Sequence, residues 1–297
     1  MPEVDPPYRG RFAPSPTGPL HLGSLIAALA SYLDARYHRG AWLVRMEDLD
    51  PPREEPGAAR HILDSLHHHG LHCDEDVVFQ SERGAAYTQA LQTLQAGGHL
   101  FSCDCSRQTL GPGGTCQGQC RQRQGHLNTP TATRVTVPRA CHIRFEDQTQ
   151  GWQETPLGSE TPDFIVKRKD GLDAYQLAVV VDDAWQGITH IVRGSDLMDS
   201  APRQIFLQQL LGHATPAYSH IPVITDAGGQ KLSKQNHAPA LENGAATANV
   251  RAALKFLQQD EPPTALRSTV QILEFATQRW APEKIPGVLS VAATRGA

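Results

Sequence analysis

Hydrophobic residues in the first hundred positions alternate between short continuous runs and helical repeats. Continuous runs predict strands, whereas apolar residues that recur every three or four positions predict helices. Alternating strands and helices are typical of a parallel sheet with helices on both faces and a ligand site at the carboxyl ends of the strands. The predicted strands are residues 8–13 and 41–46, and the predicted helices are residues 25–38, 58–69 and 84–96.

The alternation stops near residue 100 and resumes near residue 184, which indicates an insertion between two halves of one fold. β-like runs inside this stretch cover residues 142–145 and 163–167, and the main pattern then continues through residues 187–193, 200–211 and 221–224. Beyond Glu242 the spacing of Val250, Leu254 and Leu257 predicts a helical end. The expected organisation is therefore two catalytic halves, 1–99 and 184–240, an insertion, 100–183, and a helical region, 241–297.

Proline and glycine interrupt the segment 11–24, Arg-Phe-Ala-Pro-Ser-Pro-Thr-Gly-Pro-Leu-His-Leu-Gly-Ser, directly ahead of an apolar helical run. The pattern predicts a strand, a tight loop and the start of a helix, with Ser24 as the capping residue. Such a loop lets backbone N–H groups and a helix N-terminus approach a phosphate, and His21 adds a further donor.

The segment 231–235, Lys-Leu-Ser-Lys-Gln, supplies two ammonium groups. Lys231 and Lys234 could neutralise the charge that accumulates on pyrophosphate as it leaves a nucleotide, as in activation of an acid by ATP. Taken alone, either segment is better explained as an ordinary turn or a solvated pair of lysines. Their occurrence together and in this order favours nucleotide chemistry.

Four cysteines form two short pairs separated by a glycine-rich stretch: Cys103, Cys105, Cys116 and Cys120. The spacing allows the chain to fold back and close a tetrahedral sulfur site, for which zinc is the expected metal. Because four cysteines leave no open coordination position, a site for one zinc ion would be structural. Cys73 and Cys141 stand apart and are expected to be buried apolar residues.

The chain has 297 residues, 39% hydrophobic content and a formal net charge of −4, which suits a globular enzyme but is unusual for an RNA-binding protein. The charge is uneven, because residues 106–145 contain six arginines and no acidic residue. This stretch is either a local basic face or a solvated loop. The sequence shows neither a targeting segment nor an apolar run of about 20 residues, so we expect a cytoplasmic protein that does not bind membranes.

The segment Pro-Ser-Pro-Thr-Gly-Pro-Leu-His-Leu-Gly resembles the HIGH motif of class I aminoacyl-tRNA synthetases in its glutamate form, and Lys-Leu-Ser-Lys-Gln resembles their KMSKS motif. Residues 45–50, 175–183 and 193–196 also resemble blocks of this family, so the likeness covers about residues 8–240. It departs from the family at Ser24, where the motif has a second histidine, and at Gln235. The resemblance implies a Rossmann-type nucleotide-binding fold, and it supports the zinc site because such enzymes often carry a zinc knuckle there.

Glutamate presents two carboxylates and an ammonium group, so its site should offer arginine to the side-chain carboxylate and an acid to the amine. By resemblance, Arg11 and Arg193 contact that carboxylate, Glu47 holds the α-amine, and Tyr175 supplies a hydroxyl. Alternatives from the residues themselves are an ion pair of Arg193 with Asp196 and a half-buried strand position for Tyr175. The remaining expected residues are Phe12, Ala13, Pro14 and Ser15 for glutamate, His21, Gly23, Ser24 and Lys234 for ATP, and His21, Lys231 and Lys234 for catalysis.

Only residues 236–297 follow the second motif, so we expect no anticodon-binding domain. The chain thereby resembles shortened paralogues that activate glutamate with ATP and Mg²⁺ and esterify it to the queuosine base in the anticodon of tRNA(Asp). We expect such a protein to act as a monomer. Two alternatives are a compact glutamyl-tRNA synthetase that charges a tRNA 3′ end and a non-catalytic zinc-containing RNA-binding module.

Overall fold

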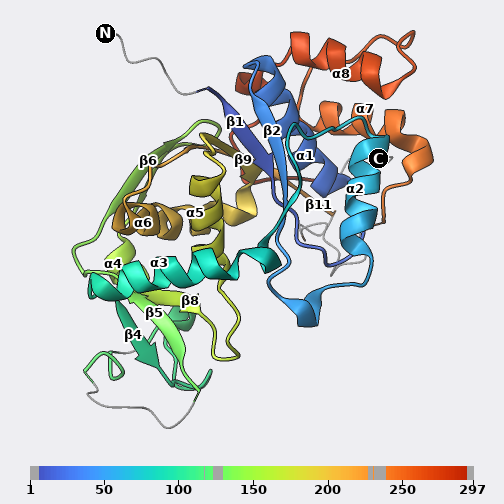
Figure 1. The fold of residues 1–297 in the computed structure, drawn as a ribbon. Helices are drawn as coiled ribbons and strands as arrows, with labels where there is room; N and C mark the ends of the chain where they lie inside the picture. Colours follow the sequence, from blue (N-terminus) through green and yellow to red (C-terminus); the bar gives the residue numbers. More distant parts are fainter. Residues whose placement is uncertain (1–6, 117, 123–129, 227–229, 231–238, 293–297) are drawn as a thin grey trace.

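The computed structural model describes residues 7–116, 118–122, 130–226, 230 and 239–292, and its centre is parallel β-structure (Figure 1). Strand β1 (Arg9–Phe12) pairs with β2 (Ala41–Met46), which pairs with the short β3 (Val78–Phe79). A second group contains β9 (His190–Gly194), β10 (Ala217–Ile221), β6 (Ile143–Asp147) and the antiparallel edge strand β7 (Gly151–Thr155).

The two groups of strands meet at β1 and β9, which lie side by side. The backbone N–H of Thr189, just before β9, donates to the carbonyl oxygen of Arg9 at 3.0 Å. The strand order across this junction is β3, β2, β1, β9, β10, so the order reverses beside β1. Ligands in sheets of this kind bind at the carboxyl ends of the strands, at the point of reversal.

Helices cover both faces of the central strands, as predicted from the alternating pattern (Figure 1). Neighbouring residues of β2 show the division, since Trp42 and Val44 belong to one core and Leu43 to the other. The first core includes helices α1 (Leu22–Tyr37), α2 (Ala58–His68), α7 (Ala246–Phe256) and α8 (Thr269–Gln278). The second includes α3 (Gly84–Ala96), α5 (Tyr175–Trp185), α6 (Ala201–Leu211) and the single turn α4 (Leu157–Glu160).

A separate antiparallel sheet carries the cysteine cluster and lies below α3 in Figure 1. It consists of β4 (Leu100–Cys103), β5 (Ala132–Thr136) and β8 (Asp163–Lys167). At the other end of the chain, β12 (Ser290–Ala292) pairs in parallel with β11 (Val223–Thr225). None of the helices in the described part of the chain is long and apolar enough to cross a membrane.

One alternative and one local prediction were wrong. The alternative strand position for Tyr175 is excluded, because this residue begins helix α5 and the apolar run that follows it packs as a helix against α3 and α6. The predicted single run 221–224 is two strands, since Pro222 separates β10 from β11 and proline cannot donate to a ladder.

Candidate active site

A cavity of about 370 Å³ lies where the carboxyl ends of β1, β9 and β10 meet. This volume falls within the usual range of small-molecule sites, roughly 300–1,000 Å³. The structure brings together at this cavity most of the residues predicted for glutamate and ATP: Arg11, Phe12, Ala13, Ser15, His21, Gly23, Ser24, Glu47, Tyr175 and Arg193.

Three predicted residues are not among those that line the cavity. Pro14 contributes its backbone instead, because its carbonyl oxygen accepts the N–H of Glu47 at 2.9 Å and so joins the loops after β1 and β2. Lys231 and Lys234 lie outside the described residues, so their predicted roles remain predictions.

Four charged side chains form a buried group beside the cavity: Arg11, Arg45, Glu47 and Asp183. The carboxylate of Asp183 lies 3.1 Å from Nε of Arg11 and 2.9 Å from Nη2 of Arg45, and the same Nη2 is 3.5 Å from Glu47. Asp183 comes from helix α5, whereas the arginines come from β1 and β2. Helix α5 thereby supplies the acid that allows two guanidinium groups to be buried under the site.

The pKa values of the two acids of this group are shifted in opposite directions. It raises the pKa of Glu47 above its ordinary value, and the neighbouring charges of Arg45 and Arg11 only partly oppose that effect. For Asp183 burial also favours the neutral form, but the guanidinium groups of Arg11 and Arg45 outweigh it and hold the pKa of this carboxyl below its usual value. Asp183 is therefore the permanent anion of the group.

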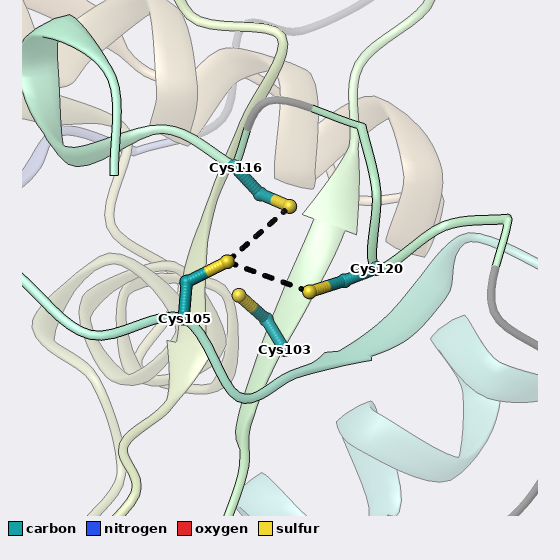
Figure 2. Close-up of side chains that lie close together, drawn as sticks. All are labelled: Cys103, Cys105, Cys116 and Cys120. Carbon is teal, nitrogen blue, oxygen red and sulfur yellow. Dashed lines mark hydrogen bonds between the residues drawn. The ribbon is translucent and has the colours of Figure 1, made fainter. Parts of the chain in front are cut away.

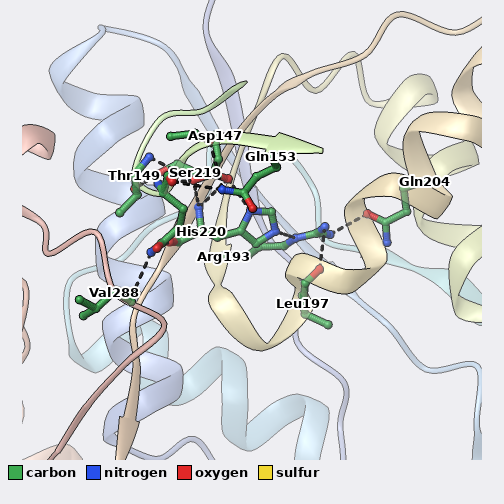
Figure 3. A network of polar contacts seen from close by, with 11 residues as sticks. Asp147, Thr149, Gln153, Arg193, Leu197, Gln204, Ser219, His220 and Val288 are labelled. Carbon is green, nitrogen blue, oxygen red and sulfur yellow. Dashed lines mark hydrogen bonds and ion pairs between the residues drawn. The ribbon is translucent and has the colours of Figure 1, made fainter. Parts of the chain in front are cut away.

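Arg193 is held by three bonds as it reaches the cavity from the end of β9 (Figure 3). Its Nε donates to Nε2 of His220 at 3.0 Å, Nη1 donates to Oε1 of Gln204 at 2.8 Å, and Nη2 donates to the carbonyl oxygen of Leu197 at 3.3 Å. The alternative pairing with Asp196 is thus not needed to explain why the guanidinium is buried.

The start of helix α1 borders the cavity through Gly23 and Ser24. Ser24 was predicted to cap this helix, but the helix begins at Leu22 and His21 is the cap, since its Nδ1 accepts the N–H of Ser24 at 3.3 Å. A Cβ at Gly23 would lie 3.0 Å from Cε1 of His21 and 3.2 Å from Cγ2 of Ile224, so glycine permits this close packing. A helix N-terminus that opens on a cavity favours an anionic ligand there.

Tyr175 lies at the amino end of α5, where it lines the same cavity. Burial raises the pKa of its hydroxyl, so the group stays protonated and can donate a hydrogen bond. The next residue, Gln176, accepts from Nε2 of Gln204 at 3.1 Å, which ties the start of α5 to the side chain that holds Arg193.

The four predicted cysteine ligands come together in the inserted sheet (Figure 2). Cys103, Cys105, Cys116 and Cys120 are all buried, and their sulfur atoms lie within 4.8 Å of one another. Two of the sulfur–sulfur separations are 3.5 and 3.9 Å. A tetrahedral site with metal–sulfur bonds of about 2.3 Å has sulfur–sulfur edges of about 3.8 Å, so the cluster fits a zinc ion in size and in ligand type.

The cluster is joined to the rest of the insertion by one buried acid. Both carboxylate oxygens of Asp163 accept the N–H of Cys116, at 3.1 and 3.0 Å, and Oδ1 pairs with Nη1 of Arg134 at 2.5 Å. Cys73 and Cys141, which were expected to be buried apolar residues, are partly buried and pack against the edges of the two cores.

Residues 8–250 match the catalytic-domain model of the class I tRNA synthetases (E and Q). The chain belongs to this family.

Two curated members of the family are similar to it over almost their whole length. Glutamyl-Q tRNA(Asp) synthetase of Pseudomonas putida (strain W619) is 50% identical over 283 residues, which cover 95% of each chain. The protein of the same name from Thiobacillus denitrificans (strain ATCC 25259 / T1) is 51% identical over 285 residues, 93% of this chain and 94% of that one. The glutamate-tRNA synthetase of Elizabethkingia anophelis superposes with a TM-score of 0.82 over 98% of this chain and 68% of its own, and its 21% identity supports the fold alone.

Asp183, which pairs with Arg11, and His220, which accepts a hydrogen bond from Arg193, were not predicted as site residues. Asp183 had a usable signal, because it ends the buried run 177–183, where an acid requires a cationic partner. His220 had no such signal. The residues around it do not indicate which side chains it meets, because those partners come from β6 and β9.

Proposed function

We propose that this cavity binds L-glutamate beside ATP and joins them into glutamyl-adenylate, and that the chain then transfers glutamate to the queuosine base in the anticodon of tRNA(Asp). The observation that carries the proposal is the arrangement of charge around one cavity. Arg11 and Arg193 supply cationic groups, and Glu47 supplies a carboxylate. An amino acid with a second carboxylate complements this arrangement, whereas its amide would leave guanidinium charge uncompensated.

In the proposed reaction, the α-carboxylate of glutamate attacks the α-phosphorus of ATP in line and pyrophosphate leaves. A hydroxyl of the modified base then attacks the acyl carbon of the mixed anhydride and AMP leaves, so no enzyme nucleophile is required. Positioning and electrostatic stabilisation account for catalysis, with Mg²⁺ accompanying the nucleotide. Gly23 and Ser24 at the start of α1, the ring of His21, and Lys231 and Lys234 would bind the phosphates.

We also propose that the four cysteines hold one structural zinc ion. The sulfur separations and the all-thiolate ligand set support this assignment. Its contribution to function would be to fix the loops of the insertion, because four protein ligands leave no position for substrate.

The first test is glutamate-dependent exchange between ATP and labelled pyrophosphate with no RNA present. The proposal expects exchange with glutamate, little with glutamine, and a large loss in Glu47→Gln. This variant replaces the α-amine's proposed acid with an amide of the same shape. Absence of exchange by the folded wild-type protein would contradict the enzymatic proposal and favour a non-catalytic RNA-binding role.

The second test follows labelled glutamate into tRNA(Asp) with and without queuosine, and maps the label by nuclease digestion. The proposal expects queuosine-dependent labelling of the anticodon fragment that survives periodate oxidation of the 3′ end, with the diol of the base protected. Labelling of the 3′ end that periodate abolishes would instead identify a compact glutamyl-tRNA synthetase.

A further inference from the structure

A buried line of three side chains runs from strand β6 through β10 to the cavity (Figure 3). Nδ1 of His220 lies 2.5 Å from Oδ2 of Asp147, and Nε2 of His220 accepts from Nε of Arg193 at 3.0 Å. His220 and Asp147 are 0% and 1% exposed. Arg193 lines the cavity, whereas the other two lie behind it.

The bonding fixes the protonation of His220. A guanidinium has no acceptor and keeps all its protons, so Nε2 of His220 must accept and the ring proton must sit on Nδ1. Asp147 receives that proton's hydrogen bond and is itself held by backbone N–H groups of Thr149 and Gln150 at 3.1 and 2.9 Å. Burial, with the nearby charge of Arg193, lowers the pKa of His220 even though Asp147 opposes this, in agreement with a neutral ring.

The hydrogen bonds of Arg193 leave two of its guanidinium N–H groups for a ligand. Its hydrogen-bond acceptors among the described residues are His220, Gln204 and Leu197, which use three of the five N–H groups of a guanidinium, and its face lies 5.2 Å from the ring centre of Tyr218. The remaining two are one on each terminal nitrogen. The bond at Nε sets the plane of the group, because Nε is the atom nearest to the flexible side-chain stem.

We propose that Asp147 and His220 are positioning residues that hold the guanidinium of Arg193 ready for the side-chain carboxylate of glutamate. This inference rests on the proposed function, which places that carboxylate at Arg193. An arginine fixed before binding loses less conformational freedom when the ligand arrives, so the pair should determine the affinity for glutamate more than the rate of the chemical step.

Asp147→Asn is the sharpest test, because it keeps the shape of the side chain and replaces one acceptor oxygen by a donor N–H₂ group. The backbone donors hold Oδ1, so the new amide N–H₂ faces Nδ1 of His220 and forces the ring proton onto Nε2. Two donors, this N–H and the Nε–H of Arg193, then face each other, so the hydrogen bond between His220 and Arg193 is lost. We expect the KM for glutamate to rise by about tenfold to a hundredfold, with kcat and the KM for ATP changed much less.

His220→Gln provides an independent variant, and His69→Gln is its matched control. Glutamine at position 220 can still offer an oxygen to Arg193, so the KM for glutamate should rise less than in Asp147→Asn. His69 is also 0% exposed and has two polar partners, the carbonyl oxygen of Ser65 at 2.7 Å and Nδ2 of Asn249 at 3.1 Å, but it does not line the cavity. Its replacement should lower stability without changing the KM for glutamate selectively.

A measurement on the wild-type protein does not depend on whether any variant folds. Long-range ¹⁵N–¹H spectra of histidine-labelled protein should show His220 as the Nδ1–H form at neutral pH, with its Nε2 signal moving when glutamate saturates the site. The Nε2–H form in the wild type, or an unchanged KM for glutamate in folded Asp147→Asn, would overturn the inference. Either result could occur with normal wild-type pyrophosphate exchange, so the proposed function would stand separately.

Discussion

Replacing Asp183 with asparagine removes the negative charge that allows Arg11 and Arg45 to be buried. The side chains of Arg11, Arg45 and Asp183 are 4%, 0% and 3% exposed, so water cannot replace the lost partner. Glu47, 3.5 Å from Arg45, would then be the carboxylate nearest to that guanidinium among the pairs described. The variant keeps the shape of the side chain, so the change in charge is isolated from a change in packing.

The expected cost follows from the distances. At 3.1 and 2.9 Å and an effective dielectric constant of about 20, each pair contributes about 5 kcal/mol of attraction. Burying the carboxylate costs the wild type several kcal/mol of desolvation, and the variant does not have this cost. The free energy of unfolding should therefore fall by about 3–5 kcal/mol, the usual cost of leaving a buried charge without its partner.

The effect has a defined pH dependence. Because the pKa of Asp183 is lowered from 3.8 in the folded protein, its stabilisation is complete above that value and is lost as the pH falls through the folded pKa. The difference in stability between wild type and variant should be largest near neutral pH and should shrink in acid. A difference that grows in acid would contradict the assignment of Asp183 as the permanent anion.

Urea unfolding followed by circular dichroism at several pH values provides the measurement. Asp260→Asn is the control, because Asp260 pairs with Lys284 at 2.6 Å on the exposed surface and its loss should change stability little. Equal unfolding midpoints for wild type and Asp183→Asn at neutral pH would refute the reasoning. The site should then also keep its affinity for glutamate, since Arg11 and Arg45 would not have moved.

Three further predictions concern the nucleotide and the metal. Gly23→Ala places a Cβ against His21, so it should raise the KM for ATP several-fold in pyrophosphate exchange while the KM for glutamate changes little; equal effects on both constants would argue against a nucleotide role for this turn. Lys234→Ala should slow exchange by about a hundredfold or more and leave glutamate binding intact, as followed by calorimetry, and unchanged exchange would remove this residue from the reaction. Chelation should release about one zinc ion per chain and speed tryptic cleavage at Arg107 and Arg121, and adding zinc should restore resistance to trypsin. A cleavage rate that neither chelation nor added zinc changes would contradict a structural metal.

Periodicity and turn chemistry alone predicted much of the fold. The helices 58–69 and 84–96 and the strand 41–46 were found to within a residue, because each is defined by the spacing of apolar residues within its own short segment. The cysteine cluster could also be predicted from the sequence, since two short pairs joined by a glycine-rich stretch can come together without distant parts of the chain. These features are local in sequence, and local patterns are sufficient to encode them.

The sequence left a choice open, or led to a wrong prediction, where the surrounding structure decides between two local possibilities. Tyr175 begins a run that is apolar enough for either a buried strand or a helix, and packing against α3 and α6 selects the helix. Ser24 suits a helix cap by residue type, but the turn places His21 in that position. In both cases the residue type allowed either possibility, and the position in the fold selected one.

The sequence, with the family resemblance it carries, nominated the residues that the structure gathers: two arginines, a glutamate and a histidine at one cavity, and four cysteines in one cluster. Only the tertiary structure decided how those groups are held. Arg11 and Asp183 are 172 positions apart, and Asp147 and His220 are 73 apart. Such pairs exist because the strand order brings remote segments together, and the low dielectric of the interior then requires each buried charge to meet a partner.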